Sequence, residues 1–185
     1  MAKYKVGYII GSLSKNSINR KFTEAFIKLA PEELELFEIE IKDLPVYTYD
    51  YDPDYPPVGR KFKQDLKDAD AVLWVTPEYN RAITAAIKNA IEWGSHPSRE
   101  SELERPSAIV SVSYGAIGGA VAQAMLREIL VGNAGATVLP GTETYIDFTK
   151  GILDENGEIV EGSRAFLTGF WTRFADFIKK NARNS

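Results

Sequence analysis

Residues 6–20 have the sequence Val6-Gly7-Tyr8-Ile9-Ile10-Gly11-Ser12-Leu13-Ser14-Lys15-Asn16-Ser17-Ile18-Asn19-Arg20. An apolar run ends at Gly11, a loop of hydroxyl and amide side chains follows, and apolar residues recur at helical spacing from Ile18. This pattern predicts a buried strand over residues 4–10 that delivers a polar loop to a helix over residues 18–29. The first-turn amides and the dipole of a helix both favour an anion, so we expect this loop to hold a phosphate group.

The rest of the chain continues the alternation of strands and helices. We expect strands over residues 34–39, 71–76 and 107–112, helices over residues 58–67 and 83–93, a helix ending near residue 131, and an amphipathic helix over residues 164–180. Gly94 and Pro97 are expected to end the helix over residues 83–93. A fifth strand is expected to begin over residues 136–139 and to be interrupted by Pro140 and Gly141. Without a linker or repeat, this order predicts one α/β domain over residues 1–185, with a five-stranded parallel sheet covered by helices on both faces.

Composition excludes several classes of protein. Hydrophobic residues make up 44% of the chain and charged residues 26%, and the net charge of -4 offers no basic excess for nucleic acid. With no cysteine and one histidine, His96, neither a metal site nor a histidine relay is expected. The N-terminus lacks the apolar region of a signal peptide and no apolar run is long enough to cross a bilayer, so we expect a cytoplasmic protein without a membrane partner.

Three polar loops follow the first, third and fourth predicted strands, over residues 12–19, 77–81 and 113–119. The carboxyl ends of parallel strands meet at one edge of a sheet, so these loops are expected to converge on a ligand. The first loop lacks both the Gly-Lys step of a P-loop and the second glycine of a dinucleotide fingerprint, and its hydroxyls and amides suit a phosphate monoester. The second can support a flat heterocycle. The alternative is that these loops only cap helices and bind nothing.

The segment over residues 42–59 combines four prolines, four tyrosines and four aspartates. It is too rich in proline for a regular element and long for a plain connection. Two interpretations stay open: an ordered surface loop, or a wall of the active site or of a partner interface.

These motifs resemble the NADPH-dependent FMN reductase family, the flavodoxin-like flavoproteins that include chromate reductases, quinone reductases and some azoreductases. The resemblance rests on Gly11–Asn19, Thr76–Asn80, Lys88–Trp93 and Ser113–Gly119, although Ser14 and Asn16 stand where arginine and glycine are common. It implies a flavodoxin-like three-layer sandwich. It also implies FMN bound by Ser12, Ser14, Lys15, Asn16, Ser17, Ile18, Asn19, Pro77, Glu78, Tyr79, Asn80, Ser113, Tyr114, Gly115 and Gly118.

The resemblance further implies a reaction in two halves. NADPH or NADH gives a hydride to flavin N5, and a quinone, a flavin or a similar small molecule then takes the electrons. No side chain is required as acid or base, and Arg81 can contact the nucleotide or an anionic acceptor. The family implies a homodimer or homotetramer, with residues 42–59 and 83–93 as candidate contacts. The alternatives are an electron carrier or FMN-binding module without nicotinamide turnover, and a structural nucleotide-binding protein.

Overall fold

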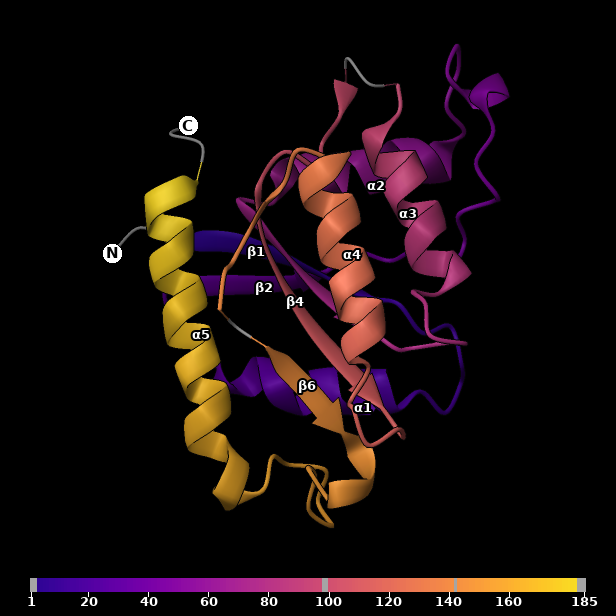
Figure 1. Ribbon diagram of the computed structural model, residues 1–185. Coiled ribbons are helices and arrows are strands. Elements are labelled where there is room, and N and C mark those ends of the chain that lie inside the picture. Colours follow the sequence, from indigo (N-terminus) through magenta and orange to yellow (C-terminus); the bar gives the residue numbers. More distant parts are fainter. Residues whose placement is uncertain (1–2, 98–99, 142, 183–185) are drawn as a thin grey trace.

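A parallel β-sheet organises the chain in the computed structural model, which describes residues 3–97, 100–141 and 143–182 (Figure 1). Its strands are β1 (Tyr4–Ile10), β2 (Leu34–Glu38), β3 (Ala71–Thr76), β4 (Pro106–Ser113), β5 (Thr137–Val138) and β6 (Thr144–Asp147). The spatial order is β2-β1-β3-β4-β5, and β6 also pairs with β4. The order reverses between β1 and β3, which is the switch point where α/β sheets of this kind bind ligands.

In the part of the chain that the structure describes, five α-helices cover the two faces of the sheet, which gives a fold of three layers. They are α1 (Ile18–Phe26), α2 (Pro57–Asp68), α3 (Ala85–Ser95), α4 (Ala120–Gly132) and α5 (Glu161–Asn181), with a 3-10 turn at Ile27–Leu29 extending α1. Phe22 and Phe26 of α1 pack with Trp171 of α5 in one core. The second core joins α2, α3 and α4 on the other face, around the buried rings of Trp74 and Trp93. The predicted fold class is confirmed.

The last position of the sheet is shared by two short strands. β5 pairs with the start of β4, and β6 pairs with its final four residues. Pro140 has no N–H to donate to a ladder, and Gly141 adopts a positive φ of 65°, so the strand breaks where the sequence predicted an interruption.

Of the two residues predicted to end the third helix, Pro97 agrees with the structure and Gly94 is wrong, because α3 continues through this glycine and ends at Ser95, before the proline. A Cβ at Gly94 would lie 2.8 Å from Leu103 Cδ2, so the glycine allows the segment after the helix to pack closely against it. Packing, rather than helix termination, explains this glycine.

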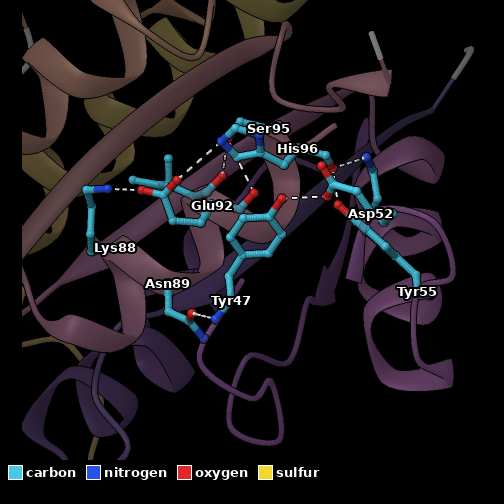
Figure 2. Close-up of polar contacts among 10 residues, drawn as sticks. Tyr47, Asp52, Tyr55, Lys88, Asn89, Glu92, Ser95 and His96 are labelled. Atoms are coloured by element: carbon cyan, nitrogen blue, oxygen red, sulfur yellow. Dashed lines mark hydrogen bonds and ion pairs between the residues drawn. The ribbon is translucent and has the colours of Figure 1, made fainter. Parts of the chain in front are cut away.

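The tyrosine-rich segment is an ordered loop that packs on α3. The backbone N–H of Tyr47 donates to Asn89 Oδ1 at 2.8 Å, and the indole N–H of Trp93 donates to the Pro45 carbonyl at 2.8 Å. The ring of His96 stacks on Tyr47 with centroids 5.1 Å apart, and the Tyr47 hydroxyl donates to Asp52 (Figure 2). These contacts favour the interpretation as an ordered surface loop and give His96 a structural place.

Within the described residues no helix is long and apolar enough to cross a membrane.

Candidate cofactor site

The three polar loops converge on one cavity at the carboxyl edge of the sheet. Its volume is about 260 Å³, and it is lined by Ser12, Ser14, Asn16, Ser17, Ile18, Asn19, Pro77, Glu78, Tyr79, Val112, Ser113 and Tyr114. Eleven of these were candidates from the sequence. Val112 was missed because an apolar strand residue carries no signal of its own. Four other candidates, Lys15, Asn80, Gly115 and Gly118, do not line the cavity.

The first loop leaves hydrogen-bond donors available at the start of α1. The Ser17 hydroxyl caps the helix by accepting the backbone N–H of Arg20 at 3.1 Å, and Ser14 Oγ accepts that of Asn16 at 3.3 Å. The amides of Ile18 and Asn19 lie in the first turn, where no intrahelical acceptor exists. The loop therefore combines hydroxyls with a helix N-terminus, as the sequence predicted.

Arg20 lies close to this loop but is committed elsewhere. Its guanidinium makes two hydrogen bonds to the Glu38 carboxylate, of 2.6 and 2.9 Å. The hydrogen bond to Glu38 raises the pKa of Arg20. Lys15 is exposed. The first loop accordingly offers neutral donors, and the Arg20 guanidinium is already paired.

Asn19 joins the first loop to the end of β4. It is 2% exposed, and its amide nitrogen donates to the Val112 carbonyl at 3.3 Å. The Asn19 Oδ1 acceptor is buried and has no hydrogen-bond partner among the described residues. A buried polar atom without a partner is rare in proteins, and here it belongs to a side chain that lines the cavity.

The second loop is a tight hairpin turn held in strained backbone geometry. Tyr79 and Ala82 exchange two backbone hydrogen bonds of 3.0 Å, and the residues between them, Asn80 and Arg81, have φ angles of 51° and 62°. Such left-handed conformations are uncommon outside glycine, and consecutive ones define a type I′ turn. The Tyr79 side chain is 54% exposed at the cavity.

Thr84 links this turn to the first loop, a role that the sequence analysis missed. Its hydroxyl accepts the N–H of Ile87, capping α3, and donates to the Gly11 carbonyl at 2.7 Å. A threonine before an alanine-rich helix is a usual cap signal, and this signal identifies Thr84.

Gly118 in the third loop allows close packing against β6. Gly118 has a φ of 59°, and a Cβ there would lie 2.6 Å from the backbone of Tyr145 in β6. Ser113 Oγ accepts the Gly115 N–H at 3.0 Å, and Tyr114 packs edge-on against Phe148. Ser113 and Tyr114 are thereby held at the cavity, which Gly115 and Gly118 do not line.

Comparison with known proteins identifies relatives along nearly the whole chain. The profile of the NADPH-dependent FMN reductase family matches residues 4–151. A quinone reductase of Pseudomonas putida is 40% identical over 180 residues, covering 96% of each chain. A 2-hydroxy-1,4-benzoquinone reductase of Burkholderia sp. is 38% identical over 177 residues, covering 95% of this chain and 96% of that protein.

A solved structure gives the same result. FerB, a flavoenzyme NAD(P)H:(acceptor) oxidoreductase from Paracoccus denitrificans, superimposes with a TM-score of 0.91 at 36% identity, over 97% of this chain and 100% of that one. The family match extends from β1 past β6 and includes all three loops of the cavity. The chain therefore belongs to the NADPH-dependent FMN reductase family, and it is an oxidoreductase with FMN as cofactor, NAD(P)H as reductant and small molecules as electron acceptors.

Proposed function

We propose that this protein reduces quinones with NAD(P)H, using FMN held in the cavity where the three loops meet. The convergence of these loops beyond β1, β3 and β4 is the observation that carries the proposal. Two relatives that cover nearly the whole chain are named quinone reductase and 2-hydroxy-1,4-benzoquinone reductase, which supports a quinone as acceptor.

The donors of the first loop fit the phosphate and ribityl chain of FMN. The hydroxyls of Ser12, Ser14 and Ser17 and the first-turn amides of α1 can donate to a phosphate monoester. The buried Asn19 Oδ1 lacks a donor, and a ligand hydroxyl can supply one. We therefore assign residues 12–19 to the phosphate end of the cofactor.

The other two loops fit a flat ring. Pro77, Glu78 and Tyr79 form one wall with backbone groups and an exposed aromatic side chain, and Ser113 and Tyr114 form another. Bound FMN supplies hydride acceptance and donation at its ring. The chain's contribution is to orient that ring, and we assign no side chain as catalytic acid or base. Arg81, 69% exposed at the end of the turn, is proposed to contact the phosphates of the incoming nucleotide.

The test is to titrate the FMN-free protein with FMN, and then to mix the loaded protein with NADPH without oxygen. We expect saturable binding, bleaching of the flavin absorbance within seconds, and recovery of that absorbance on adding a benzoquinone. A protein that binds no FMN contradicts the site. Bleaching followed by no reaction with any of a panel of quinones contradicts the acceptor class. Parallel runs with NADH determine which nucleotide is preferred.

We further propose that residues 1–185 act as one FMN-binding domain, in the cytoplasm, as a homodimer or homotetramer. Val121, Met125 and Val131 expose apolar side chains along α4, which supports self-association. Light scattering at micromolar concentration checks this, and a monomer contradicts it.

A further inference from the structure

The Glu78 side chain lines the cavity, and its carboxylate is hydrogen-bonded to the start of α4. This side chain is 8% exposed. Oε2 accepts the backbone N–H groups of Val121 and Ala122 at 3.0 and 3.1 Å, and Oε1 accepts Nη1 of Arg81 at 3.1 Å. One carboxylate thus connects two elements that are far apart in the sequence.

Helix α4 depends on this contact because it has no cap of its own. The residue at its N-cap is Gly119, with a φ of 85° and no side chain to accept the first-turn amides. A Cβ at this position would lie 2.9 Å from Ser111 Cβ, so packing against β4 disfavours a capping serine or aspartate there. Glu78 supplies the missing acceptor, and its negative charge lies at the positive end of the α4 dipole.

We propose that Glu78 is a positioning residue with two separable functions. Through Oε2 it fixes the turn at residues 77–81 against the loop that precedes α4. The distance between these two walls of the cavity is thereby held constant. Through Oε1 it orients Arg81, which the strained turn already presents at the surface. The inference rests on the proposed FMN site, since the spacing matters for the ring that lies between these walls.

The two functions can be separated by substitution. In Glu78→Gln the amide oxygen can still accept from Val121 and Ala122, but the amide nitrogen faces the Arg81 guanidinium, so donor meets donor. Glu78→Ala removes both contacts. Arg81→Gln removes only the second contact, from the other side, and an exposed position tolerates it. A matched control is Glu161→Ala in α5, where Glu161 and Arg164 form an ion pair of the same spacing and the same 3.1 Å length.

The experiment measures the FMN dissociation constant, the KM and kcat with NADPH, and hydrogen exchange at the amides of Val121 and Ala122. For Glu78→Ala we expect FMN binding weakened about tenfold, as for loss of a helix cap, and faster exchange at both amides. Glu78→Gln should keep FMN binding and slow exchange but raise the KM for NADPH as much as Arg81→Gln does, with kcat unchanged. Glu161→Ala should leave every quantity unchanged.

Two results overturn the proposal. One is FMN binding and amide exchange in Glu78→Ala equal to those of the wild type. The other is a Glu78→Gln/Arg81→Gln double variant whose KM exceeds that of Arg81→Gln, because Glu78 then does not act through Arg81. Should Glu78→Ala fail to fold, the Gln variants still decide between these outcomes. A wild-type protein that binds no FMN rejects the proposed function instead.

Discussion

The loop at residues 12–19 and the turn at residues 77–81 line the same cavity but are built in opposite ways. The first loop keeps first-turn amides and hydroxyls available, and the neighbouring Arg20 is paired with Glu38. In the turn, the backbone closes on itself between Tyr79 and Ala82, and the carboxylate of Glu78 is fully engaged. The first loop leaves donors unpaired, whereas the turn is held by hydrogen bonds within its own backbone and through the Glu78 carboxylate.

This difference follows from the ligand parts that each loop is proposed to hold. A phosphate needs several hydrogen-bond donors that have no partner in the protein. Leaving these donors unpaired costs little free energy, because water can accept their hydrogen bonds when no ligand is bound. A flat ring needs a surface that does not move, and a surface is fixed by satisfying its own polar groups in advance. The strain at Asn80 and Arg81 is tolerated because so many contacts hold the turn.

The largest expected effect is at the junction between the two loops. In Gly11→Ala, the new Cβ would overlap the buried side chain of Ile87 in α3 and lie 3.1 Å from Pro77 Cδ. Since Ile87 has no solvent to move into, we expect the free energy of unfolding to fall by about 2–3 kcal/mol. Urea denaturation of the FMN-free protein measures it.

Gly162→Ala in the first turn of α5 is the control, because nothing lies within 4 Å of a Cβ at that position. It should be neutral or slightly stabilising. Equal unfolding free energies for the Gly11→Ala and wild-type proteins would show that Gly11, Ile87 and Pro77 are not tightly packed together.

A smaller effect is expected within the first loop. Ser17→Ala removes the hydroxyl that caps α1, and should lower the unfolding free energy by about 1 kcal/mol without FMN. Ser14→Ala loses only an exposed contact of 3.3 Å and should leave stability unchanged while still weakening FMN binding. Thermal melting with and without FMN separates the two. If both substitutions destabilise the FMN-free protein equally, the loop is more preorganised than its contacts indicate.

Local patterns predicted most of this architecture from the sequence. The limits of β1 and β3 coincide with the predicted ranges, because continuous apolar runs ended by Gly11 and Pro77 leave little freedom. The convergence of the three loops also followed from the sequence, since it depends only on parallel strands and their order.

What the sequence did not predict depends on contacts between distant residues. No local pattern shows that Glu78 caps a helix beginning at Ala120, or that Arg20 pairs with Glu38. Gly94 is a typical helix-end residue in the sequence, but in the structure it lies within the helix, where it allows Leu103 to pack closely. In the turn, Asn80 adopts a left-handed conformation, and the cap of α3 is Thr84, four residues further on.

The smallest expected effect has the opposite sign and tests the strain in the turn directly. In Arg81→Gly, glycine accepts the φ of 62° without penalty, which should stabilise the FMN-free protein by about 1 kcal/mol, and loss of the ion pair between the exposed Arg81 side chain and the buried Glu78 side chain offsets part of this. We expect a net gain of about 0.5 kcal/mol in chemical denaturation. Arg164→Gly, which breaks the matched pair in a helix, should lose about 0.5–1 kcal/mol instead. If Arg81→Gly is destabilising, the turn at residues 77–81 is not strained. The difference between this turn and the loop at residues 12–19 then depends on their hydrogen bonds alone.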